Sequence, residues 1–198
     1  MLEGLNILLG VSGGIAAYKA VDLANKLTAA GAGVNTVMTG NACRLVDPKS
    51  FEAVTRSAVF TSLWDRSEEY KISHINLVDW ADVVVVAPAT ANIIGKIANG
   101  ICDDLLSTTL CVCWAKPTLL APAMNSNMWN NPAVQHNVKM VKEMGFELIG
   151  PEEGRLACGT EGIGRMSEPE DILAAIEKMA SEIKGNKKIN RRERRETN

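Results

Sequence analysis

The sequence predicts a single-domain α/β fold with three layers, in which helices cover both faces of a central parallel sheet. Short runs of Val, Ile and Leu alternate along the chain with longer segments of helical periodicity. The run Val83–Val86 is continuous rather than alternating, which is typical of a strand buried on both faces. A chain of 198 residues, 46% of them hydrophobic, can bury one core of this kind.

Five strands and the helices between them follow one another in βα order. The strands are predicted at residues 5–11, 33–38, 83–86, 118–121 and 146–149, with Pro88 ending the third. Helical patterns cover residues 15–31, 48–55, 93–97, 101–114, 131–145 and 168–183, and residues 61–73 are expected to form a surface loop. This order requires right-handed crossovers between parallel strands.

Four strand ends carry small and polar residues: Ser12–Gly14, Thr39, Thr90–Asn92 and Ala123–Asn125. Open α/β sheets bind ligands at the carboxyl ends of their strands, so we expect these residues to form one site. They offer N–H groups and contain no Lys or Arg, which favours a large neutral ring with one phosphate over a triphosphate with magnesium. The turn VSGGIAA lacks the G-x-G-x-x-G and G-K-[ST] patterns, and an ordinary βα turn remains the alternative.

Two further segments contain reactive side chains. Of the two histidines, His74 follows a polar loop and is the better acid or base candidate, whereas His136 lies among polar helix residues and is expected at the surface. Residues 154–166 are dense in glycine, which predicts a mobile flap or a tight hairpin; a long surface turn is the alternative. The Cys158 thiol there can donate a proton or attack as thiolate, and Arg165 can pair with a carboxylate or phosphate.

Cysteine usage and hydropathy predict a cytoplasmic protein. The five cysteines include no C-x-x-C pair, which argues against a disulfide framework and against a zinc site, so we expect no metal. Four of them are expected to be small core residues: Cys43, Cys102, Cys111 and Cys113. No apolar run reaches the roughly 18 residues that a membrane span requires, and no membrane partner is expected.

The charge distribution divides the chain into two parts. The formal net charge is −2, but residues 185–198 contain six Lys or Arg and two Glu. We expect one α/β domain over residues 1–184 and a basic, disordered tail over residues 185–198. No aromatic or groove-reading motif accompanies the tail, so nucleic-acid binding is not expected.

Five motifs within residues 6–183 carry a resemblance to the flavin-dependent cysteine decarboxylases. They are GVSGGIAAYK (10–19), SHINL (73–77), APATANIIGKIANGICDDLLST (87–108), PAMNSNMW (122–129) and ACGTEGIGRM (157–166). PAMNSNMW is similar to the family's P-x-M-N-x-x-M-W motif, and ACGTEGIGRM resembles the substrate clamp of the branch that acts on 4′-phosphopantothenoylcysteine. The resemblance implies a Rossmann-like (flavodoxin-like) fold, an FMN cofactor, and a carboxy-lyase activity that forms 4′-phosphopantetheine in coenzyme A biosynthesis.

The resemblance also implies a role for individual residues. FMN would be bound by Gly13, Gly14, Thr39, Thr90, Ala91, Asn92 and Ala123. In the family's reaction the substrate's cysteine moiety is oxidised by the flavin to a thioaldehyde, CO₂ leaves, and the enethiolate is then reduced. His74 would be the base or steer the carboxylate, Asn125 would bind the carboxylate and amide region, and Cys158 would be the proton donor. Met128 and Arg165 would complete the substrate site.

The same resemblance suggests partners and rival functions. Family members are homotrimers or multiples of trimers, homododecamers included, with the flavin at a subunit interface, so His74 is expected to act on a neighbour's flavin. Many bacterial members are fused to a phosphopantothenate–cysteine ligase, so the chain is expected to be either a single-function enzyme with a separate ligase partner or a fragment. A peptidyl-cysteine decarboxylase, a flavin prenyltransferase and a non-catalytic phosphatase regulator remain the alternatives.

Overall fold

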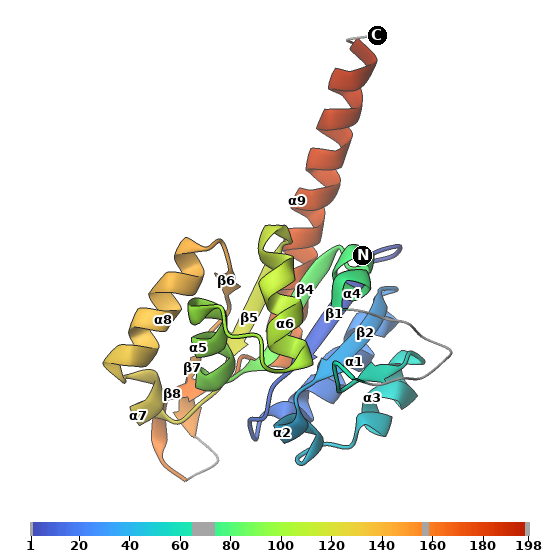
Figure 1. Ribbon diagram of the computed structural model, residues 1–198. Helices are drawn as coiled ribbons and strands as arrows, with labels where there is room; N and C mark the ends of the chain where they lie inside the picture. The colour runs from blue at the N-terminus through green and yellow to red at the C-terminus, as the bar shows by residue number, and fades with distance from the viewer. Residues whose placement is uncertain (1, 65–73, 156–158, 197–198) are drawn as a thin grey trace.

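A computed structural model describes residues 2–64, 74–155 and 159–196 and contains a six-stranded parallel sheet (Figure 1). The strands are β1 (Asn6–Val11), β2 (Gly33–Met38), β3 (Val59–Phe60), β4 (Val83–Ala89), β5 (Thr118–Pro122) and β6 (Glu147–Leu148). Their order in the sheet is β3-β2-β1-β4-β5-β6, and every neighbouring pair is parallel. The predicted α/β fold with a parallel sheet is confirmed. The edge strand β3 was not predicted, because two residues are too short to form a pattern.

Helices cover both faces of this sheet. One face is covered by α1 (Ala17–Ala29), α2 (Gly40–Cys43), α3 (Pro48–Thr55) and α9 (Pro169–Glu196). The other is covered by α4 (His74–Trp80), α5 (Ala91–Asn99), α6 (Leu105–Val112) and α8 (Pro132–Glu143). Alternate residues of β1 enter the two cores, since Ile7 and Leu9 belong to the first and Leu8 to the second.

The strand order reverses between β1 and β4. Gly10 of β1 pairs with Val37 of β2 on one side and with Val86 of β4 on the other. The chain therefore leaves these two adjacent strands toward opposite parts of the sheet, and a crevice opens outside their carboxyl ends. The prediction that Pro88 ends the strand is wrong: β4 continues to Ala89, because Ala89 pairs with Pro122 of β5 after a register shift.

The described parts of the glycine-rich segment, on either side of residues 156–158, form two paired strands, as expected for a hairpin rather than a long surface turn. Strands β7 (Glu152–Arg155) and β8 (Glu161–Arg165) pair in antiparallel fashion. The amide of Met124 donates to the carbonyl of Gly164 at 3.0 Å, so β8 is held against the loop that follows β5. Gly164 has φ 144°, and a Cβ there would overlap the Met124 carbonyl, so this contact requires glycine.

Helix α9 is longer than the sequence pattern predicts. It runs from Pro169 to Glu196 and projects beyond the sheet (Figure 1). A disordered tail is predicted from residue 185, whereas the backbone continues as helix to Glu196. Gly185 does not end it, because Lys, Arg and Glu are good helix formers and no proline follows. Across the described ranges no helix, α9 included, combines the length and apolar content that a membrane crossing needs.

Candidate functional site

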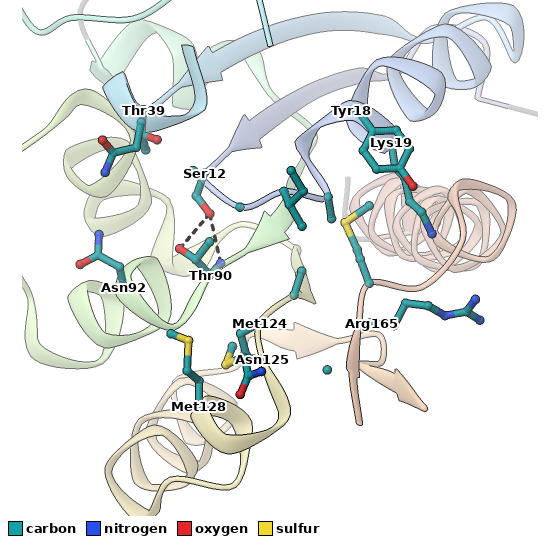
Figure 2. Close-up of a pocket in the computed structure, with 18 of the residues that line it drawn as sticks. Ser12, Tyr18, Lys19, Thr39, Thr90, Asn92, Met124, Asn125, Met128 and Arg165 are labelled. Atoms are coloured by element: carbon teal, nitrogen blue, oxygen red, sulfur yellow. Dashed lines mark hydrogen bonds between the residues drawn. The ribbon is translucent and has the colours of Figure 1, made fainter. Parts of the chain in front are cut away.

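A cavity of about 1160 Å³ opens at the carboxyl edge of the sheet, where the strand order reverses (Figure 2). All four predicted strand ends reach its wall. The wall residues among those predicted are Gly13, Gly14, Thr39, Thr90, Asn92, Ala123, Asn125, Met128 and Arg165. Cavities that bind cofactors and drug-sized ligands measure roughly 300–1,000 Å³, so this one can hold a nucleotide together with a second molecule.

Ser12 and Thr90 join the two central strands at the back of the cavity. The Ser12 hydroxyl donates to the Pro88 carbonyl at 2.7 Å and lies 3.0 Å from the Thr90 hydroxyl. Its oxygen accepts the Thr90 amide at 3.1 Å (Figure 2). Ser12 is 2% exposed, so these bonds are shielded from water and fix the relative position of the β1 and β4 loops.

Three of the predicted contact residues are helix N-caps. Thr39 accepts the Ala42 amide at the start of α2, and Thr90 accepts the Ile93 amide at the start of α5. Asn125 accepts the Asn127 amide at the start of α7 (Ser126–Trp129). Thr90 is thus both the N-cap of α5 and a residue of the cavity wall.

The glycine turn after β1 leaves room for an anion. No side-chain oxygen caps the start of α1, whose positive end faces the cavity beside the turn. A Cβ at Gly13 would overlap Asn41, and one at Gly14 would lie 3.2 Å from the Thr90 methyl. Side chains are excluded here, so a ligand meets the backbone of the turn and the positive end of α1; the Gly14 amide itself donates to the Ser12 carbonyl at 2.9 Å. This arrangement fits the phosphate of a flavin nucleotide.

Lys96 adds a charged side chain to the cavity wall, whereas the strand-end residues are uncharged. Its Nζ lies 2.5 Å from Asp103 Oδ1 and 2.6 Å from Asp104 Oδ2, and its side chain is 14% exposed. The hydrogen bond from Lys96 holds the pKa of the Asp103 carboxyl below its usual range. Asp104 caps α6 in a capping box with Ser107. Lys96 and Asp104 both line the cavity, so its α5 side is an ionic cluster in which one ammonium faces two carboxylates.

The opposite wall carries three more cations, two of which are paired. Arg165 Nη2 lies 2.9 Å from Glu152 Oε2, and Lys19 Nζ lies 2.8 Å from Glu168 Oε1. Arg155 lines the cavity from the end of β7, and within the described residues no carboxylate pairs with it. Sequence reasoning missed Lys19 and Lys96, because neither lies in a strand-end loop, and it gave no role to Arg155, which lies in the glycine-rich segment.

The remaining predicted residues do not line the cavity or lie outside the described residues. His74 is the first residue of α4 and is half-buried, but it does not line the cavity, and neither does Ala91 at the start of α5. Cys158 lies outside the described residues. His136 is exposed on α8, as predicted.

The cysteines differ in burial more than the sequence suggests. Cys113 is fully buried, and this burial raises the pKa of its thiol to about 11, while Cys43 is half-buried. The expectation of a core position is wrong for Cys102 and Cys111, which are exposed because they precede α6 or lie on its outer side. Among the residues that the structure describes, no group of three or more His, Cys, Asp or Glu could hold a metal ion.

Comparisons with known proteins agree with this site. Residues 1–181 match the family described as Flavoprotein. The chain is 50% identical over 182 residues to the coenzyme A biosynthesis bifunctional protein CoaBC of Bacillus subtilis (strain 168); the match covers 92% of this chain and 45% of that protein. The chain thus spans less than half the length of this curated relative.

Two solved structures are similar over nearly their whole length. A cysteine-to-serine variant of PPC decarboxylase, complexed with pantothenoylaminoethenethiol, aligns with a TM-score of 0.79 and 36% identity, over 89% of this chain and 98% of that one. The FMN-binding protein AtHal3 aligns with a TM-score of 0.76 and 36% identity, over 88% and 96%. On the match over residues 1–181 and on these alignments, the chain belongs to the Flavoprotein family.

Proposed function

We propose that this chain catalyses the FMN-dependent decarboxylation of 4′-phosphopantothenoylcysteine to 4′-phosphopantetheine, a step of coenzyme A biosynthesis. The proposal rests mainly on one contact. The hydrogen bond from Met124 N to Gly164 O joins the PAMNSNMW loop to the ACGTEGIGRM hairpin on the wall of the same cavity that the Gly13–Gly14 turn bounds. The two motifs specific for the cysteine decarboxylases therefore face the nucleotide turn. The similarity to PPC decarboxylase and to CoaBC supports this substrate.

The residues at the crevice suit FMN. The turn at Gly13 and Gly14 would hold its phosphate, and Thr39, Asn92 and Ala123 line the space next to it. When bound, the flavin supplies the two-electron oxidation of the substrate's cysteine and the later return of those electrons. The protein contributes binding, orientation and the movement of protons.

The substrate would be bound by the opposite wall of the cavity. Asn125, held at the start of α7, would orient the substrate's carboxylate and amide, and Met128 beside it offers an apolar surface. Arg165 is already bound by carboxylates, whereas Arg155 has no acidic partner within the described residues. We therefore propose that Arg155 binds the phosphate of the substrate and that Arg165 stabilises the hairpin. Cys158 is proposed as the proton donor on the basis of the motif.

His74 is proposed to reach the cavity of a second copy of the chain. It lies at the start of α4 next to Ile75, which is 50% exposed, and away from its own cavity. At the cavity mouth, Ile15 and Tyr18 are 63% and 62% exposed. Apolar side chains at both places suit a subunit interface. We propose a homotrimer or a multiple of trimers, in the cytoplasm, with a ligase domain or a separate ligase as partner.

Mixed oligomers test this proposal. His74→Asn and Asn125→Ala should each bind FMN yet release no CO₂ from 4′-phosphopantothenoylcysteine, while His136→Asn should match wild type because His136 is exposed on α8. Co-assembly of the two inactive variants should restore part of the activity, since some sites then receive an intact residue from each chain. Full activity of His74→Asn alone would remove His74 from the reaction, and failed restoration in mixed oligomers would place the whole site in one chain.

A further inference from the structure

The carboxylate of Glu168 lies between two cations that reach the cavity from different elements. Both of its oxygens accept from Lys19 Nζ at 2.8 Å, and Oε1 lies 3.5 Å from Arg165 Nη1. Lys19 is in the first turn of α1, directly after the glycine turn, and Arg165 is the last residue of β8. Glu168 thus links the proposed nucleotide side of the cavity to the hairpin.

This link gives Arg165, at the base of the hairpin, a contact from outside the hairpin. Arg165 is paired with Glu152 in the β7–β8 register, and Glu152 Oε2 accepts from Arg165 Nη2 at 2.9 Å, but both of these residues belong to the hairpin itself. Glu168 supplies a second carboxylate from outside the two strands. On the other edge of β8 the bond between Met124 N and Gly164 O fastens the hairpin to the loop after β5.

We propose that Glu168 is a positioning residue that holds the β7–β8 hairpin at a fixed place relative to the glycine turn. It acts through Lys19 and Arg165 and touches no reacting atom. A carboxylate suits this role because its two oxygens can accept hydrogen bonds from two cations at once, and its negative charge lowers the repulsion between them. Lys19 is 15% exposed, so without Glu168 its ammonium would remain largely desolvated and unpaired. The kinetic part of this inference rests on the proposed decarboxylase function; the structural part does not.

Glu168→Gln in the FMN-loaded protein tests the inference, and Glu170→Gln is the matched control. Glu170 also joins α9 to α1, through Lys26 at 2.9 Å, but it does not line the cavity. Glu168→Gln should speed amide hydrogen exchange at residues 161–165 by about fivefold, the effect of losing one ion pair. Glu170→Gln should leave exchange there unchanged.

The kinetic readout separates positioning from general damage. In Glu168→Gln we expect KM for 4′-phosphopantothenoylcysteine to rise about fivefold while kcat changes less than twofold, because the hairpin then has to be ordered on binding. Unchanged hairpin exchange in Glu168→Gln, or an equal change in Glu170→Gln, would overturn the inference. If wild type shows no decarboxylation, the proposed function fails, and the exchange comparison still decides the role of Glu168.

Discussion

The Ser12 hydroxyl and the Thr90 amide lie 3.1 Å apart and join the two strands between which the order of the sheet reverses. Thr90 caps α5, and Ser12 precedes the turn into α1, so one bond connects the starts of the helices on opposite faces. The cavity lies where these helices diverge. Any nucleotide bound at the glycine turn therefore contacts a loop whose position Ser12 sets.

Ser12→Ala should destabilise the protein and weaken its hold on FMN. The substitution removes the buried partner of the Thr90 amide and leaves the Pro88 carbonyl with only the longer bond from the Ser12 amide at 3.3 Å, which costs about 1–3 kcal/mol. The free energy of unfolding from urea titration and the FMN dissociation constant from fluorescence quenching measure the two effects. Ser181→Ala, on the exposed face of α9, is the control; equal stability of both variants would show that the Ser12 bonds do not hold the loops.

Lys96→Met should raise the pKa of the Asp103 carboxyl toward its ordinary range. The hydrogen bond from Lys96 lowers that pKa in the folded protein, so the stability it contributes is present above the unfolded pKa and is lost as the pH falls through the folded one. NMR titration of the Asp103 carboxyl measures the shift directly. Lys139→Met, which removes an exposed pair with Glu143, should leave Asp103 unchanged. A titration of Asp103 that is the same in all three proteins would contradict the ionic cluster.

Cys113 should make the protein less stable in alkali. Burial raises the pKa of its thiol to about 11, so the folded state disfavours the thiolate. The stabilising contribution is complete below the unfolded pKa and is lost as the pH rises from about 9 to about 11. Between these limits the loss of unfolding free energy should be about 2 kcal/mol smaller in Cys113→Ala than in wild type. The exposed Cys111→Ala should keep the wild-type dependence, and a wild-type dependence in Cys113→Ala would refute the assignment.

Arg155→Gln should affect the phosphorylated substrate selectively. Loss of a charged hydrogen bond to phosphate is expected to raise KM for 4′-phosphopantothenoylcysteine about 10- to 100-fold. Pantothenoylcysteine, which lacks the phosphate, should be used equally well by the variant and wild type. Steady-state kinetics with both substrates, and with the surface variant Arg44→Gln as control, provide the comparison. An equal rise in KM for both substrates would place the phosphate elsewhere.

Elements with strong local signals could be predicted from the sequence. Pro48–Thr55 matches the prediction residue for residue, because Asp47 caps the helix and Pro48 occupies its first position. Asn131 and Pro132 mark the start of α8 in the same way. The apolar runs of β1 and β4 were equally clear, and β2 has the predicted bounds, residues 33–38. The strand-end rule then predicted which loops would share a cavity.

The charged part of the cavity could not be predicted in this way. Lys19 and Lys96 lie on helices, and whether their side chains face the cavity depends on how α1 and α5 pack. The partner of Lys19 follows 149 residues later in the chain. The two partners of Lys96, Asp103 and Asp104, follow seven and eight residues later. A pattern of hydrophobic residues contains no information about such pairings. The position of His74 outside the cavity likewise follows from packing rather than from its neighbours in sequence.

Mass spectrometry of the products tests the central claim most directly. The FMN-loaded protein is mixed with 4′-phosphopantothenoylcysteine, and the organic product and CO₂ are measured. The account predicts stoichiometric loss of CO₂ and formation of 4′-phosphopantetheine, with none from Asn125→Ala. If the flavin-loaded wild type leaves this substrate intact but decarboxylates a peptide with a carboxy-terminal cysteine, the assignment of the substrate is contradicted and the chain is a peptidyl-cysteine decarboxylase.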